Sequence, residues 1–207
     1  MCGRYSFIPP ADFFSRLEIT NRDYQLQANY HVTPGSFMPV VFKSSPKQVA
    51  NMRWGLIPYW AKDPRIAYHT INARVEGLAS KPAFRGLLKN RRCLIPASGF
   101  FEWARTGNTK KPYFVKLKNH DWFVFAGLYD IWKDPEGMEH KTYTIITVPA
   151  NSVVAKIHDR MPAILKARDE DLWADNSSYS PNLLRLLVPY PAGDMSLVPA
   201  SLGEKLV

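Results

Sequence analysis

The sequence predicts one α+β domain over residues 1–207, with a mostly antiparallel, curved or barrel-like β-sheet and peripheral helices. A chain of 207 residues can bury one sizeable core, and 46% of its residues are hydrophobic. Seventeen prolines and eleven glycines are spread along the chain, which is typical of many short strands joined by turns. The predicted strands follow one another, with helices inserted and appended. This order differs from the regular strand–helix alternation of a doubly wound sheet.

The first half of the chain is predicted to begin with a helix. Phe13, Phe14 and Leu17 recur at helical spacing behind two prolines, which indicates a helix at residues 9–19. Three strands are expected next, at residues 38–42, 50–56 and 70–75. A short helix with its apolar residues on one side is expected at residues 82–89.

The second half is predicted to be richer in strands. Its extended segments alternate in polarity or carry β-branched and aromatic residues. Five strands are expected, at residues 93–96, 99–104, 113–118, 122–132 and 143–148. The remaining segments indicate helical structure, at residues 151–157, 167–173 and 182–187.

Composition argues against several classes of protein. No apolar run approaches the length of about 18 residues that a membrane span needs, and the N-terminus lacks a signal-peptide pattern, so we expect a cytoplasmic protein. Two cysteines, Cys2 and Cys93, are too few for a disulfide framework. Cys93 lies in an apolar run and is expected to be a buried small hydrophobe. No zinc-ligand spacing occurs, so neither a metal nor another cofactor is expected.

The chain carries a formal net charge of +9, from 27 basic and 18 acidic residues. This excess favours a polyanionic partner such as nucleic acid. Many soluble proteins are basic without a specific partner, however, and the charges here are scattered along the chain. Only the fold can gather them into a patch, so charge alone leaves both interpretations open.

Cys2 directly follows Met1 and is the most informative candidate for chemistry. Removal of Met1 would leave an N-terminal cysteine whose α-amine and thiol lie on adjacent carbons. Such a 1,2-aminothiol condenses with an aldehyde to a Schiff base, and the thiol then closes a five-membered thiazolidine. An α-amine titrates near pH ~8, below lysine, so part of it is nucleophilic at cellular pH. The alternative is that Cys2 is simply the residue that follows Met1.

Glu102 lies among aromatic residues in GFFEW at residues 99–103. In an extended strand, Phe100 and Glu102 share one face. An ionised carboxyl group is costly to bury in such surroundings, and this property suits a general acid or base. The alternative is an edge glutamate that reaches solvent.

Two further segments pair a polar side chain with an arginine two positions later. If IHDRMP at residues 157–162 is extended, His158 and Arg160 point the same way and combine a proton-transfer group with a phosphate anchor. Asn72 and Arg74 share a face in the same manner, where the amide can orient a hydroxyl or carbonyl group and the guanidinium can bind phosphate. The alternatives are a structural histidine and an ordinary surface strand.

Aromatic residues gather in RWGLIPYW at residues 53–60, beside basic residues. Trp54 lies within a predicted strand and is expected in the core. Tyr59 and Trp60 follow a proline and precede a polar loop, so they are candidates for an exposed platform on which nucleic-acid bases stack.

Together these segments resemble the SOS-response-associated peptidase (SRAP) family, whose members are abasic-site processing proteins. The matching segments occur in family order and span most of the chain. They are MCGRY at 1–5, WGLIP at 54–58, INARVE at 71–76, RRCLIP at 91–96, GFFEW at 99–103 and IHDRMP at 157–162. The resemblance implies a β-rich, barrel-like fold with helices, in agreement with the pattern-based prediction.

The resemblance implies a protein that traps abasic sites in single-stranded DNA as a covalent adduct and shields them from strand cleavage. It implies that Cys2 is the nucleophile and that the protein removes its own Met1. Asn72 would orient the sugar, Glu102 would take part in acid–base steps, and His158 would help to open the sugar ring. DNA contacts are expected from Arg4, Arg74, Arg160, Tyr59, Trp60 and Trp103. We expect a monomer that associates with the nucleoid when bound to DNA.

Two features depart from the family pattern. His31 stands where relatives usually carry asparagine, and the chain after Val198 is shorter than usual. Two other functions remain open from the residues: a noncovalent reader of modified or single-stranded DNA, and a thiol protease acting on other proteins. A protease of that kind normally pairs an internal cysteine with histidine and needs no free α-amine.

Overall fold

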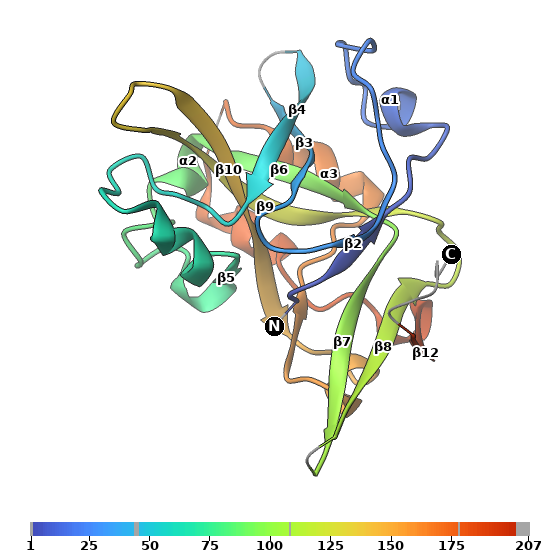
Figure 1. The fold of residues 1–207 in the computed structure, drawn as a ribbon. Coiled ribbons are helices and arrows are strands. Elements are labelled where there is room, and N and C mark those ends of the chain that lie inside the picture. Colours follow the sequence, from blue (N-terminus) through green and yellow to red (C-terminus); the bar gives the residue numbers. More distant parts are fainter. Residues whose placement is uncertain (1, 44–45, 108, 178, 202–207) are drawn as a thin grey trace.

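The computed structural model describes residues 2–43, 46–107, 109–177 and 179–201, and arranges their strands in two sheets (Figure 1). One sheet has seven strands and the other has five. Most neighbouring strands are antiparallel, and the helices lie at the periphery. The predicted α+β fold with a barrel-like sheet is therefore confirmed.

Five strands of the larger sheet close into a barrel. β9 pairs with both β10 and β6, so the order β10–β4–β3–β6–β9 forms a ring. Only the contact between β4 and β10 is parallel within this ring. The strands are β3 (Phe37–Lys43), β4 (Lys47–Trp54), β6 (Arg92–Ala97), β9 (Phe123–Lys133) and β10 (Glu139–Pro149). Closure removes the free edges that an open sheet would present.

The C-terminal half of β10 carries two short strands, one on each side. β5 (Asn72–Arg74) runs parallel to β10, and β11 (Arg160–Pro162) runs antiparallel to it. Thr147 of β10 pairs with Arg74 on one side and with Pro162 on the other. Two segments that sequence analysis selected for chemistry therefore flank a single strand.

The second sheet has the order β12–β8–β7–β1–β2. Its strands are β1 (Tyr5–Phe7), β2 (Asn29–Val32), β7 (Gly99–Thr106), β8 (Thr109–Leu117) and β12 (Met195–Pro199). β1 pairs with the base of β7, through Tyr5 opposite Phe100 and Ser6 opposite Gly99. Farther out, β7 and β8 continue as a hairpin that projects from the body of the molecule (Figure 1).

Short helices surround the two sheets. The α-helices are α1 (Phe13–Arg16), α2 (Leu87–Asn90) and α3 (Ala167–Ala174). The 3-10 helices are η1 (Pro64–His69), η2 (Val75–Gly77), η3 (Val154–Lys156), η4 (Pro181–Leu186) and η5 (Ala192–Asp194). Arg92 ties two of them to the barrel, because its fully buried guanidinium donates to the carbonyl groups of Lys89 at 3.1 Å and, through Nε, of Trp173 at 2.8 Å.

A buried aromatic group joins β1 to the barrel. The hydroxyl groups of Tyr5 and Tyr143 lie 2.8 Å apart, and the Trp54 ring stacks on Tyr143 with centroids 6.4 Å apart. Trp54 Nε1 donates to the Ile71 carbonyl at 2.8 Å. The predictions that Trp54 and Cys93 are core residues are confirmed, since both are fully buried.

The helices are shorter than predicted. Residues 9–19 contain α1 and turns, and residues 82–89 are mostly turns before α2. Helices this short gain little from propensity, and their buried side chains are held by packing against the sheets. The strands β1, β2, β11 and β12 were not predicted. Each has three to five residues, too few for alternation to show, and pairing with neighbours far away in sequence defines it.

Candidate functional site

Cys2 lies between the two sheets, immediately before β1. In Figure 1 the blue start of the chain runs between β10 and β7. The residue is fully buried, and its Sγ donates a hydrogen bond to the Arg4 carbonyl at 3.5 Å. Burial raises the pKa of the thiol well above its ordinary value, and the negative charge of Glu102 raises it further. The thiol is therefore protonated, and it needs a base before it can act as a nucleophile.

Asn72 holds the backbone of Cys2. Its Nδ2 donates to the Cys2 carbonyl at 2.8 Å. Pairing with Ile145 of β10 sets the place of Asn72, whose side chain is buried. The Oδ1 atom is also buried and has no hydrogen-bond partner within the described part of the chain. Because an unsatisfied buried acceptor costs about 1–3 kcal/mol, Oδ1 is a ready acceptor for a donor that arrives beside Cys2.

Glu102 lies in β7 opposite Tyr113 and is only 3% exposed. The alternative of an edge glutamate that reaches solvent is therefore wrong. Its charge raises the pKa of the Cys2 thiol, so these two buried groups lie close enough to interact electrostatically. A carboxylate near a protonated thiol can accept the proton that the thiol must lose.

His158 lies just before β11 and is partly buried. Its Nδ1 accepts a hydrogen bond from the Arg160 backbone N–H at 3.0 Å and lies 2.9 Å from Asp159 Oδ1. In the neutral ring with its proton on Nε2, Nδ1 accepts from Arg160. In the charged ring, Nδ1–H donates to Asp159. Each protonation state thus has a partner, as a proton-transfer group requires.

The Arg160 side chain is directed at Glu76. Its Nη1 and Nη2 donate to the two carboxylate oxygens at 2.6 and 3.0 Å, and Nη2 also donates to the Thr147 carbonyl at 2.7 Å. These contacts lower the pKa of Glu76. Sequence analysis did not identify Glu76, since nothing in its local pattern reveals a partner 84 positions away. The predicted phosphate contact of Arg160 stays a prediction, in which phosphate competes with Glu76.

Two further arginines reach the site from different sheets. The Arg4 guanidinium lies 5.9 Å from the centroid of the Trp103 ring, within reach of a cation–π contact. The Arg4 carbonyl accepts from the Phe101 N–H at 2.9 Å, which fastens the N-terminal segment to β7. Arg74 is exposed at the end of β5. Cations from both sheets are thus close to the segments that hold Cys2.

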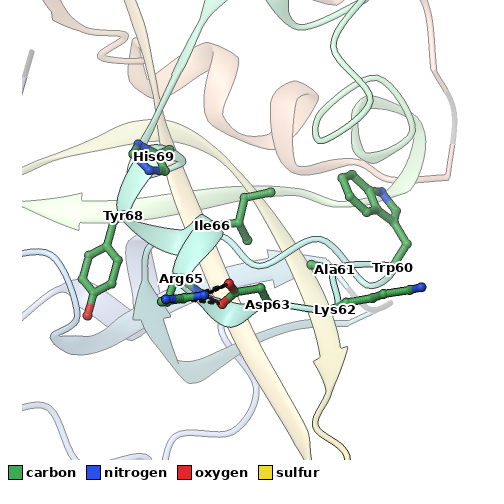
Figure 2. Close-up of a pocket in the computed structure, with 8 residues that line it drawn as sticks. All are labelled: Trp60, Ala61, Lys62, Asp63, Arg65, Ile66, Tyr68 and His69. Carbon is green, nitrogen blue, oxygen red and sulfur yellow. Dashed lines mark hydrogen bonds and ion pairs between the residues drawn. The ribbon is translucent and has the colours of Figure 1, made fainter.

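A second candidate surface is the loop that precedes and includes η1 (Figure 2). Tyr59 and Trp60 are 71% and 47% exposed, as a stacking platform requires. The Tyr59 N–H is anchored by Asp130 Oδ2 at 2.8 Å. Trp60 borders an open hollow of about 900 Å³, whose other lining residues are Ala61, Lys62, Asp63, Arg65, Ile66, Tyr68 and His69. Such a mixture of aromatic and cationic side chains suits single-stranded nucleic acid.

His31 lies away from the Cys2 side of β7. Its ring packs on Phe101, with centroids 5.3 Å apart, whereas Glu102 points to the opposite face of the strand. His31 Nδ1 is buried and has no hydrogen-bond partner among the residues that the structure describes. The structure therefore places His31 on the same face of β7 as Trp103.

Some predictions concern parts outside the described residues. One such part is Met1, which includes the predicted processing site at the Met1–Cys2 bond. The last residues of the C-terminal tail are the other. Among the described residues, no three His, Cys, Asp or Glu side chains are grouped to hold a metal ion. Within the same ranges, no helix has the length and apolar character to cross a membrane.

Sequence comparison relates the chain to proteins named for abasic sites. A family model described as SOS response associated peptidase (SRAP) matches residues 1–202. Abasic site processing protein YoqW of Bacillus subtilis (strain 168) is 42% identical over 203 residues, which cover 94% of this chain and 90% of that protein. Abasic site processing protein HMCES of Gallus gallus is 36% identical over 187 residues, covering 74% of this chain and 56% of that longer protein.

Solved structures share the two-sheet arrangement. A crystal structure of a Bacteroides thetaiotaomicron protein matches with a TM-score of 0.90 and 32% identity, covering 97% of this chain and 93% of the other. A crystal structure from Bordetella bronchiseptica, at 21% identity and a TM-score of 0.83, shares the fold. The family match extends over nearly the whole chain and includes all the residues described above. The chain therefore belongs to the SOS response associated peptidase family.

Proposed function

We propose that this protein processes abasic sites in single-stranded DNA by forming a covalent crosslink through Cys2 after it has removed its own Met1. One observation supports the proposal: Cys2, Asn72 and Glu102 come from separate parts of the chain and are all buried, with Asn72 hydrogen-bonded to the Cys2 carbonyl and the charge of Glu102 acting on the Cys2 thiol. The relatives are named for the processing of abasic sites, which supports this class of substrate. A buried N-terminal thiol with a carboxylate and an amide beside it suits trapping of an aldehyde.

The reaction uses both nucleophiles of an N-terminal cysteine. The ring-opened deoxyribose of an abasic site carries an aldehyde at C1′. The Cys2 amine attacks that carbon, a C–N bond forms, and one water leaves, which gives a protonated Schiff base. The thiol sulfur then attacks the same carbon and loses its proton, and the π electrons of the C=N bond return to nitrogen. The product is a thiazolidine, and the whole sequence releases one water.

Glu102 is the proposed base for the second step. Because burial keeps the Cys2 thiol protonated, ring closure requires a nearby acceptor for the sulfur proton. In the first step the protonated Glu102 carboxyl group gives its proton to the departing hydroxyl group, which leaves as water. The resulting carboxylate then takes the sulfur proton in the second step, so the carboxyl group is regenerated. Proton transfers of this kind typically accelerate a reaction by about 10²–10⁴-fold.

Asn72 and His158 prepare the reactants. The unsatisfied Asn72 Oδ1 can accept a hydrogen bond from the Cys2 amine or from a sugar hydroxyl, while its Nδ2 keeps the Cys2 carbonyl in place. His158 has a partner in both protonation states and moves a proton during opening of the closed sugar. Opening is needed because the closed hemiacetal offers no aldehyde to the amine.

DNA binding requires no reading of bases. An abasic site has no base, and an intact nucleotide offers no aldehyde, so the chemistry itself discriminates. Arg4, Arg74 and Arg160 are proposed to contact phosphates, and Tyr59, Trp60 and Trp103 to stack on neighbouring bases. Affinity should then depend strongly on salt concentration, because phosphate contacts release counterions.

Intact mass spectrometry tests the proposal. The purified protein is first weighed to establish loss of Met1 and is then incubated with a single strand containing one abasic site. The expected product survives heating in denaturant and has the mass of the processed protein plus the DNA minus one water. Cys2→Ala should abolish it, whereas Cys93→Ala, which removes the internal thiol, should retain it. An undiminished adduct in Cys2→Ala would exclude the thiazolidine, and retention of binding without any adduct in the wild type would indicate a noncovalent reader.

A further inference from the structure

The outer half of the β7–β8 hairpin is a two-stranded ribbon that has no neighbouring strand among the described residues. The N-terminal segment covers β7 as far as Phe101, whose N–H donates to the Arg4 carbonyl, and the chain from β12 to Ala200 covers β8 as far as Pro112, whose carbonyl accepts from the Ala200 N–H at 3.0 Å. Farther out, within the described part of the chain, the hairpin pairs only with itself, from Ala104 opposite Lys111 outward. Figure 1 shows this part projecting from the body.

The ribbon is basic on its outer half. Residues 103–112 contain Arg105, Lys110 and Lys111 and no acidic residue. All three cations are exposed. Within the described part of the chain, none of them takes part in an ion pair. Their charge is thus available to an anion from outside the protein.

The register separates the three cations into two faces. Arg105 lies directly opposite Lys110, so both side chains project from one face, which is also the face of Trp103. Lys111 lies opposite Ala104 and projects from the other face. Like charges directly opposite each other destabilise a ribbon. An anion bound between Arg105 and Lys110 would remove that repulsion.

The face that carries Arg105 and Lys110, which is the face of β7 opposite Glu102, continues a line of side chains that begins at His31 and Arg4. At its base the His31 ring packs on Phe101, and one step farther out the Arg4 guanidinium lies over Trp103. Alternate residues of a strand are about 6.6–6.8 Å apart, so Arg105 and Lys110 form the next step of the same line. A chain with evenly spaced negative charges would meet a cation at successive steps.

We propose that this face of the ribbon binds the backbone phosphates of the single-stranded DNA that flanks the abasic nucleotide. The proposal rests on the proposed function for the location of the DNA. It assigns Arg105 and Lys110 to DNA contact and excludes Lys111, which carries the same charge on the same ribbon but faces away. Because phosphates carry no base information, the contact strengthens binding without sequence preference.

Three single variants of the processed protein test it: Arg105→Ala, Lys110→Ala and, as the matched control, Lys111→Ala. Affinity for an intact single strand of about 20 nucleotides is measured by fluorescence anisotropy over a range of salt concentrations. Arg105→Ala and Lys110→Ala should each weaken binding and each lower the slope of log affinity against log salt by about 0.7, the value for one single-strand contact. Lys111→Ala should leave the slope unchanged. Thermal melting checks that the exposed substitutions leave the fold intact.

The outcomes separate this proposal from the proposed function. Equal effects of all three variants would show a general effect of net charge and overturn the assignment to one face, and unchanged slopes in Arg105→Ala and Lys110→Ala would overturn it outright. The same measurement is made with DNA whose flank is double-stranded. A change of slope that appears only with this DNA would also overturn the proposal. Crosslinking of abasic DNA should proceed at the wild-type rate in the control variant Lys111→Ala. If the wild type forms no crosslink, the proposed function fails whatever the slopes show.

Discussion

At the scale of single residues, Cys2 is held by its backbone and not by its side chain. Asn72 binds the Cys2 carbonyl, and the adjacent Arg4 segment is fastened to β7 through its own carbonyl. The thiol makes one long hydrogen bond, at 3.5 Å. This arrangement suits the proposed role of Cys2 as a nucleophile, because the thiol does not have to leave a strong partner before it reacts.

Replacement of Glu102 by glutamine should slow crosslinking by about 100-fold or more while the protein remains folded. Glutamine keeps the size of the buried side chain but cannot accept the thiol proton, and the loss of one proton-transfer group typically has this magnitude. Crosslinking rates are compared by denaturing gel between pH 6 and pH 8, only on protein whose mass shows loss of Met1. Glu136→Gln, an exposed change, serves as the control. A wild-type rate in processed Glu102→Gln would leave Glu102 with a structural role.

The sequence identified site residues only where residue type or a family motif marks them. Cys2, Asn72 and Glu102 were selected in this way, and the structure brings them together. Glu76 was missed because its partner Arg160 is distant in sequence. For the same reason the sequence could not show that the Arg160 guanidinium is paired with Glu76. That pairing depends on how η2 packs against β10 and β11.

At the scale of elements, β10 organises the molecule. It closes the barrel with β9 and β4 and at its far end holds β5 and β11. The long barrel strands could be predicted from their apolar and β-branched composition. The predicted strand at residues 70–75 contains β5, but the equally short β1 and β11 could not be predicted, because a segment of three residues carries no period. The positions of β5 and β11 are set by hydrogen bonds to β10, and the site depends on them.

Closure of the barrel should be sensitive to a single methyl group at Gly127. A Cβ at this position would lie 2.3 Å from Ile95 Cδ1 and 2.9 Å from the Thr144 carbonyl oxygen, across the seam between β6, β9 and β10. Gly127→Ala should therefore lower the free energy of unfolding by about 1–3 kcal/mol, as overpacking of a core typically does. Urea denaturation measures it. Gly86→Ala, where a Cβ meets nothing within 4 Å, is the control and should be neutral or slightly stabilising.

The ion pair between Glu76 and Arg160 should make the free energy of unfolding depend on pH. Hydrogen bonds from Arg160 lower the pKa of Glu76 in the folded state. A carboxyl group with a lowered pKa contributes stability above its unfolded pKa, near pH ~4.3, and loses it as pH falls through the folded value. The free energy of unfolding should therefore decline less steeply below about pH 5 in Glu76→Gln than in the wild type. The effect should be small, because the Glu76 side chain is 55% exposed.

Urea denaturation at several pH values between 3 and 7 measures this dependence. Glu139→Gln is a suitable control, since Glu139 forms only an exposed pair with Lys133 at 3.3 Å. If the free energy of unfolding depends on pH in the same way in Glu76→Gln and in the wild type, the ion pair between Glu76 and Arg160 does not contribute to stability.

At the scale of the whole molecule, the basic side chains differ in their burial and pairing, and therefore in whether a partner can reach them. Arg92 is buried among carbonyl groups, and Lys47, Arg16 and Arg160 are paired with acidic residues. Arg74 and the hairpin cations are exposed, while Arg4 lies against Trp103. Net charge from the sequence could not distinguish these groups. The fold keeps some cations for its own stability and leaves others beside the site.

Arg74→Ala should weaken binding equally to abasic and intact single strands. A phosphate contact is blind to the presence of a base, so both affinities fall together, and the dependence of log affinity on log salt should flatten by about 0.7. Arg168→Ala removes another exposed arginine, from α3, and is the control. Selective loss of binding to abasic strands would instead place Arg74 at the sugar, and an unchanged slope would assign it to the fold.

The position of Cys2 has a consequence for synthesis of the protein. Cys2 is among the first residues to leave the ribosome, yet Asn72, Glu102 and the β11 segment that follows His158 are made much later. At the usual translation speed of about 5–20 residues per second, Cys2 waits roughly 10–30 s for the last of them. Until Asn72 and Glu102 have been made, the Cys2 carbonyl has no amide to bind and its thiol has no carboxylate nearby. The proposed site is thus complete only after synthesis has passed β11.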